Sequence, residues 1–77
     1  MKVDLPDLLV HLDETLDHDH LAAIETDLRQ DSGVVSVAFH DDRPHVMVVA
    51  YDPKVTTERA ILGRVTAEGV HAELAGL

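Results

Sequence analysis

The chain has 77 residues, enough for one small domain with a modest hydrophobic core, and we expect residues 1–77 to form that single domain. Hydrophobic residues make up 45% of the sequence, which is typical of a folded chain. The formal net charge of −9 argues against binding to nucleic acid or to an anionic membrane, because both are polyanions. There is no cysteine, so disulfides and thiolate metal sites are excluded.

The N-terminal segment MKVDLPDLLV carries acids and a proline where a secretory signal would have a basic stretch and then an apolar run. No segment approaches the ~20 apolar residues that are needed to cross a bilayer. We therefore expect a cytoplasmic protein that does not bind membranes.

The first half of the chain predicts a strand, a helix and a second strand. Residues 8–12, LLVHL, are a short apolar run typical of a strand. In the segment 20–33, HLAAIETDLRQDSG, large apolar residues recur at spacings of three and four, which predicts an amphipathic helix that ends before Gly33. Residues 34–39, VVSVAF, are rich in β-branched residues and predict the second strand.

The second half predicts a strand, a helix and a strand. HDDRPH, residues 40–45, has turn chemistry, and VMVVAY, residues 46–51, is apolar on both faces, as in an interior strand. The loop DPKVTT leads into the helix ERAILGRVTAEG, with Thr56 or Thr57 as N-cap and Gly69 as the stop. Because Gly63 is unfavourable in mid-helix, we expect it to lie against a neighbouring element.

The segment VHAEL, residues 70–74, alternates in polarity and predicts a final edge strand. The order βαββαβ favours a ferredoxin-like α+β sandwich, in which a four-stranded antiparallel sheet carries both helices on one face. The expected core comprises Leu12, Leu21, Ile24, Leu28, Val37, Phe39, Val49, Ile61, Val65 and Leu74.

The segment IETDLRQDSGVVSVAF resembles the helix–Gly-Val–strand part of the heavy-metal-associated domain, the module of copper chaperones and metal-pumping ATPases. VVAYDPKVTTERAILGRVTAEGVHAEL is similar to the third strand, Tyr-Asp-Pro turn, second helix and last strand of that family. The resemblance covers residues 8–74. It implies the ferredoxin-like fold and a role in metal binding.

The family binds metal through a Cys-x-x-Cys motif in the loop that enters the first helix. The corresponding positions here hold Asp17 and His20, and Glu14 and Thr15 replace the glycine and methionine that usually precede the motif. The resemblance therefore does not imply Cu(I) transfer between thiolates. It leaves open a metal site in the same loop with other ligands.

Asp17 and His20 are three residues apart, so both can face one point at the start of a helix, where His18 and Asp19 could add ligands. Carboxylate and imidazole together suit Zn²⁺, Ni²⁺ or Co²⁺. The alternative is that Asp17 or Asp19 is only an N-cap in an acidic first turn, and that the histidines are solvated.

His11 and His71 fall on the first and last strands, which are neighbours in this fold. If both face the open side of the sheet, they form a second candidate metal site; the alternative is two solvated histidines. His40 and His45 flank the turn and are explained by its polarity.

Val46, Val48 and Ala50 are expected on the open face, where they form an apolar strip suited to a partner protein or a weak homodimer. The sequence has no recognisable nucleophile–base pair and no phosphate-binding glycine loop, so we do not expect an enzyme.

Two hypotheses follow. The first is a metal-binding module that buffers, senses or delivers a divalent metal, with a metal transporter as a candidate partner. The second is a degenerate, metal-free domain that acts in protein interaction or dimerisation.

Overall fold

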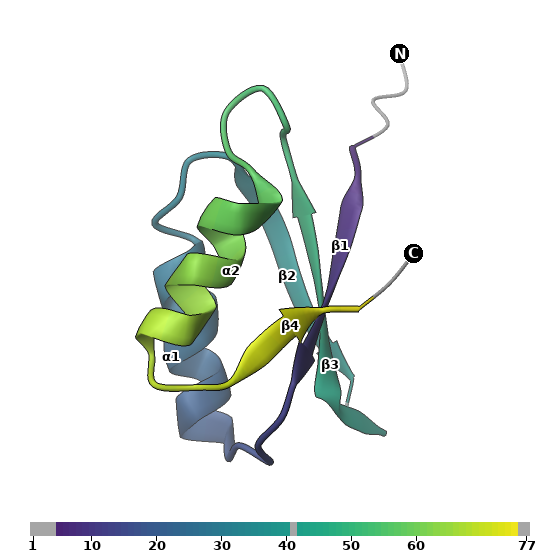
Figure 1. Cartoon of the computed structure of the whole chain (residues 1–77), viewed down its shortest axis with the longest axis vertical. Coiled ribbons are helices and arrows are strands. Elements are labelled where there is room, and N and C mark those ends of the chain that lie inside the picture. The colour runs from purple at the N-terminus through teal and green to yellow at the C-terminus, as the bar shows by residue number, and fades with distance from the viewer. Residues whose placement is uncertain (1–4, 41, 76–77) are drawn as a thin grey trace.

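The computed structural model describes residues 5–40 and 42–75 (Figure 1). Three parts of the chain lie outside the described residues: residues 1–4, Asp41 and residues 76–77. The first belongs to the N-terminal segment that was compared with a secretory signal, and Asp41 belongs to the predicted turn. The elements are β1 (Asp7–Leu12), α1 (His18–Leu28), β2 (Val34–His40), β3 (Arg43–Tyr51), α2 (Glu58–Ala67) and β4 (Ala72–Leu74).

The four strands form one antiparallel sheet in the order β2-β3-β1-β4, and both helices cover the same face of it (Figure 1). The predicted ferredoxin-like sandwich is confirmed. β3 is an interior strand and β4 an edge strand, as expected. β3 begins at Arg43 rather than at residue 46, and β4 begins at Ala72 rather than at residue 70.

The side chain that precedes each helix caps it. Asp17 accepts a hydrogen bond from the His20 backbone N–H at the start of α1, and Thr57 accepts one from the Ala60 N–H at the start of α2. Such a cap satisfies an N–H that has no partner within the helix. Of the two predicted caps for α2, Thr57 is therefore the one used.

The helix-facing side of the sheet and the inner sides of both helices form the core. Most of the predicted core is confirmed, while Leu21 and Phe39 are only partly buried. The prediction for Leu74 is wrong: it is 37% exposed, because it lies on the short edge strand. Buried core residues that the prediction omitted are Leu8, Val10, Met47, Tyr51 and Val70.

Two glycines have opposite surroundings. A Cβ atom at Gly33 would lie 2.6 Å from Cγ2 and 3.0 Å from the backbone nitrogen of Thr56. This turn therefore has no room for a side chain at position 33. A Cβ atom at Gly63 would meet nothing within 4 Å. The expectation that Gly63 lies against a neighbour is therefore wrong, since that side of α2 faces solvent.

Neither helix of the described residues lies on the other face of the sheet (Figure 1). Met47 and Val49 are buried beneath the helices, whereas Val46, Val48 and Ala50 alternate with them and are half-buried on the open face. The predicted strip thus lies on the expected face. Among the described residues, no helix is both long and apolar enough to span a membrane.

Candidate metal centre

The loop between β1 and α1 ends in a carboxylate–imidazole pair. Oδ1 of Asp17 accepts two hydrogen bonds from His20, one from its backbone N–H at 2.9 Å and one from ring Nδ1 at 2.7 Å. The capping role predicted for Asp17 is present. The same oxygen also fixes the orientation of the neighbouring ring.

This pairing has a chemical consequence for His20. The hydrogen bonds from the His20 backbone and ring hold the pKa of Asp17 below its ordinary value, so the carboxylate is ionised and acts as the acceptor. Nδ1 must then be the donor, and in the neutral ring Nε2 carries the free lone pair. Side-chain exposures of 66% for His20 and 68% for Asp17 leave the pair open to solvent.

His18 and Asp19 lie in the first turn of α1 and are exposed. In the described part of the chain, they do not combine with Asp17 and His20 into a group of three ligand atoms within 4.8 Å of one another. The four residues predicted as ligands are therefore adjacent, but a shared metal would require a rearrangement of their side chains.

A second carboxylate–imidazole pair connects this loop to the start of the last strand. Glu14 accepts hydrogen bonds from the backbone N–H of His71 at 2.9 Å and from its ring Nδ1 at 2.7 Å. The hydrogen bond with the imidazole lowers the pKa of Glu14, and the carboxylate raises the pKa of His71. His71 is thus held by the loop.

The suggested meeting of His11 and His71 needs correction. The register of β1 and β4 places Glu73 opposite His11, since Val10 pairs with Leu74 and Leu12 with Ala72. His11, Asp13 and Glu73 each bring one ligand atom within 4.8 Å of the others. Sequence reasoning missed Asp13 and Glu73, although strand alternation places both on the face of His11.

His45 has a larger role than turn polarity. Its Nδ1 lies 2.9 Å from the carbonyl oxygen of Leu12, and its Nε2 lies 3.2 Å from the hydroxyl of Thr15. Because a carbonyl only accepts, Nδ1 is the donor, and in the neutral ring Nε2 accepts from the Thr15 hydroxyl. Both nitrogens are used, so His45 is not a candidate ligand. The side chain of His40 lies outside the description.

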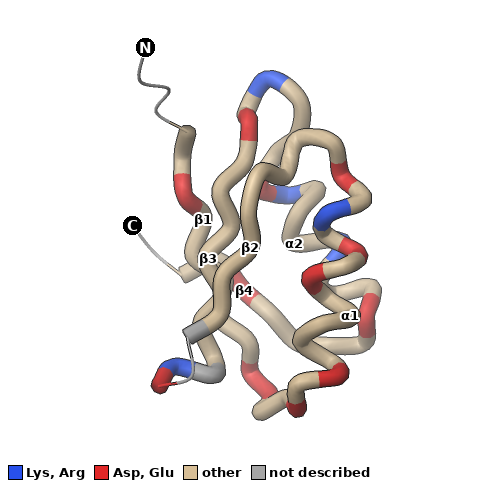
Figure 2. The backbone as a smooth tube through the Cα atoms, turned by 180° about the vertical axis from the view of Figure 1, so that it is seen from behind, with Lys and Arg blue, Asp and Glu red and all other residues tan. Residues whose placement is uncertain are grey.

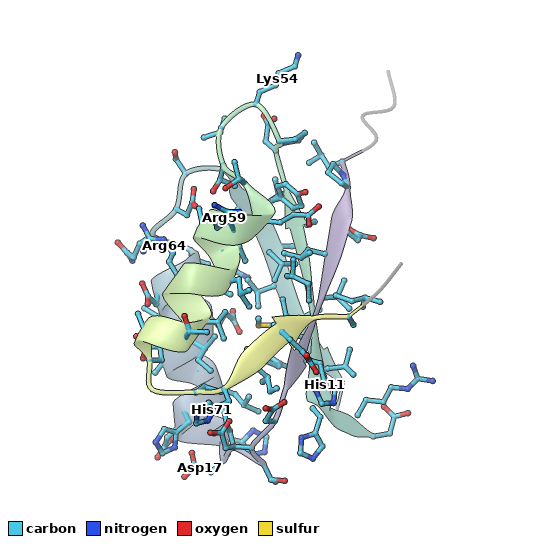
Figure 3. All side chains as sticks on the ribbon, in the orientation of Figure 1. His11, Asp17, Lys54, Arg59, Arg64 and His71 are labelled. Atoms are coloured by element: carbon cyan, nitrogen blue, oxygen red, sulfur yellow. The ribbon has the colours of Figure 1, made fainter. Side chains whose placement is uncertain are left out.

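The candidate ligands gather at one end of the molecule. Figure 3 shows Asp17, His71 and His11 towards that end and Lys54 at the opposite end. Acidic residues lie along the β1–α1 loop, where Figure 2 shows red segments at the foot of α1. The local charge therefore favours cations over anions.

No family model and no curated protein matches the sequence. Solved structures do match the fold. The N-terminal domain of a potential copper-translocating P-type ATPase from Bacillus subtilis, in its Cu(I)-loaded state, has a TM-score of 0.84 at 18% identity, over 95% of this chain and 90% of that one.

Two further solved structures have a similar fold. A copper-binding domain from HMA7, a P-type ATPase, has a TM-score of 0.81 at 18% identity over 91% of this chain and 93% of its own. Oxidized MerP from Ralstonia metallidurans CH34 has a TM-score of 0.82 at 11% identity, over 95% of this chain and 100% of that one. The resemblance to heavy-metal-associated domains is confirmed in the fold, and this chain has that fold without any cysteine.

Proposed function

We propose that the chain is a small metal-binding module that takes a divalent transition metal, Zn²⁺, Ni²⁺ or Co²⁺, at the β1–α1 loop. The observation that carries the proposal is the Asp17–His20 pair, in which a carboxylate holds Nδ1 and leaves Nε2 free and exposed. Metal-binding histidines commonly have this kind of carboxylate partner. The metal-binding roles printed for the structural neighbours support the proposal.

The roles of the loop residues follow from their positions. His20 binds the ion through Nε2, and Asp17 orients the ring through Oδ1. His18 and Asp19, both exposed in the first turn, complete the site after side-chain rotation. Imidazole and carboxylate are ligands for borderline and hard ions, so a divalent metal replaces the Cu(I) that thiolates prefer.

An exposed site with few protein ligands suits transfer better than storage. Water fills the remaining coordination positions and can be replaced by the ligands of a recipient protein. We therefore propose a cytoplasmic chaperone-like or sensing role, with a metal transporter as the recipient, and no catalytic activity.

The test is calorimetric titration with Zn²⁺, Ni²⁺ and Co²⁺ of the wild type and of Asp17→Ser combined with His20→Ala. Serine keeps an N-cap, so the far-UV circular dichroism should be unchanged while loop affinity falls at least tenfold. Thr57→Ala is the matched control, because it removes a cap without removing a ligand. Unchanged loop affinity in the double variant would contradict the proposal, and so would a wild type that binds no metal at the loop.

The open face favours a second candidate function. Val46, Val48 and Ala50 are half-buried on a sheet face that no described element covers, which suits an interaction or dimerisation module. If two such faces stack, high salt should strengthen the dimer by screening the net charge of −9. Analytical ultracentrifugation at low and high salt tests this, with Val48→Asp as the disrupting variant. A wild type that remains monomeric in both buffers excludes the homodimer.

A further inference from the structure

The pairing of β1 with β4 brings together three metal-ligating side chains, none of which belongs to the Asp17–His20 pair. His11 lies opposite Glu73, and Asp13 follows two residues after His11 on the same side of the chain. One ligand atom from each of the three lies within 4.8 Å of the other two. The group therefore consists of one imidazole and two carboxylates at the edge of the open face.

The spacing inside this group suits an ion better than a direct hydrogen bond. Nδ1 of His11 lies 3.5 Å from Oδ1 of Asp13, beyond the usual range for a hydrogen bond from nitrogen to oxygen. Two ligands of one tetrahedral Zn²⁺, with bonds of about 2.0–2.2 Å, lie about 3.4 Å apart. The two atoms are thus separated as two ligands of one ion would be.

The ring nitrogen of His11 gives an independent indication. Nδ1 is buried and has no hydrogen-bond partner among the described residues, although 45% of the side chain is exposed. A buried polar atom without a partner is unfavourable. A cation held between Nδ1 and the carboxylates would supply that partner.

The surroundings hold the group in place and keep it accessible. The His45 ring stacks on the His11 ring at a centroid distance of 6.1 Å, and both of its own nitrogens are already bonded. The backbone N–H of Asp13 donates to the carbonyl of His71 at 2.8 Å. An open hollow of about 420 Å³, lined in part by Asp13 and Glu73, admits solvent and ions to the carboxylates.

We infer that His11, Asp13 and Glu73 form a second site for a divalent transition metal such as Zn²⁺. The ion would join β1 to β4, which is a three-residue strand at the edge of the sheet. Binding would therefore hold the last strand against the sheet. Although Asp13 lies in the β1–α1 loop, this site shares no ligand with the Asp17–His20 site and does not depend on metal binding there.

The test uses the double variant with Asp17→Ser and His20→Ala, so that the loop site is removed. Zn²⁺ is titrated while ¹H–¹⁵N spectra and amide hydrogen exchange are recorded. We expect the resonances of His11, Asp13 and Glu73 to shift together, and exchange of the β4 amides to slow at least tenfold at saturation. Adding Glu73→Gln, an exposed and nearly isosteric change, should weaken Zn²⁺ binding at least tenfold and abolish the protection.

The wild type separates the two sites, because loop binding perturbs His20 and sheet binding perturbs His11. Glu73→Gln in an otherwise wild-type chain should remove only the sheet response. Two results would overturn the inference: no Zn²⁺-dependent shift at His11 in the loop double variant, or an affinity there that Glu73→Gln leaves unchanged. A loop that fails to bind Zn²⁺ would leave the sheet-site result intact.

Discussion

The β1–α1 loop and the β3–α2 loop both lead from a strand into a helix, and each ends in a side chain that caps the helix. Asp17 and Thr57 accept from the N–H three residues onward, at 2.9 and 3.1 Å. Only Asp17 also binds an imidazole through the capping oxygen. Thr57 caps α2 and has no titratable or metal-ligating group.

This difference separates a structural task from a chemical one. A helix start needs one acceptor, and a hydroxyl meets that need as well as a carboxylate does. The extra hydrogen bond that the His20 ring donates to Asp17 is not required for α1 to form. Variants that compare the two loops, and the helices they start, can therefore separate stability from metal binding.

The largest effect should come from the single fully buried isoleucine of each helix. Ile24 is 1% exposed and Ile61 is 0% exposed. Truncation of either to alanine should lower the free energy of unfolding by about 2–5 kcal/mol, because it leaves a cavity in the shared core. Urea unfolding measures both. A loss below about 1 kcal/mol at one position alone would show that the two helices do not contribute equally.

The next effect lies where the turn after α1 meets the loop before α2. Gly33→Ala would place Cβ against the side chain and backbone of buried Thr56, so something must move. We expect a loss of about 1–3 kcal/mol in the free energy of unfolding, as in other overpacked sites.

Gly63→Ala is the matched control for this change, since the space around Gly63 is open. It should raise the free energy of unfolding by up to about 1 kcal/mol through helix propensity. The same sign for both variants would contradict the contact between Gly33 and Thr56.

The caps should give smaller and nearly equal effects. Asp17→Ala and Thr57→Ala should each lower the free energy of unfolding by about 1 kcal/mol. Asp17→Ser should recover most of that stability without restoring metal affinity. If Thr57→Ala weakens metal binding as much as Asp17→Ala does, the division between structural and chemical tasks is wrong. Thermal unfolding and calorimetry together give both readouts.

The smallest effect is a stabilisation that is present at neutral pH and lost in acid. The Thr56 hydroxyl and the Gly33 N–H donate to Asp31 and hold the pKa of its carboxyl below the ordinary value. This stabilisation is present above about pH 4 and is lost as the pH falls through the lowered pKa. Asp31→Asn should therefore be less stable than the wild type at pH 6, with the difference shrinking towards pH 3. A constant difference in urea unfolding would contradict the pKa direction.

Most of the fold could be predicted because the element order and the apolar periodicity agree. The capping role of Asp17 was also readable from residue type. Leu74 could not be placed correctly, because its alternation is that of an inward residue while its strand ends at the sheet edge. The surroundings of Gly63 depend on how α2 packs, which composition does not report.

The candidate sites were less predictable because they depend on register. A shift of two residues in the pairing of β4 decides whether His11 meets His71 or Glu73, and a three-residue strand carries little pattern to specify it. Likewise, the sequence could not predict that one oxygen of Asp17 accepts from both the backbone and the ring of His20, because this depends on the positions of individual atoms. Residue types indicated metal chemistry, and the sheet pairing decided which residues could share an ion.

The two outer strands also limit how copies of the chain can associate. β2 has irregular pairing with β3 between Val34 and Ser36 and again between Phe39 and His40, while β4 is only three residues long. An incoming strand needs a long, regular row of free N–H and C=O groups. Neither outer strand offers such a row, so strand addition at the edges of the sheet is disfavoured. Val35 on β2 can therefore be 53% exposed with little tendency to extend the sheet into a fibril.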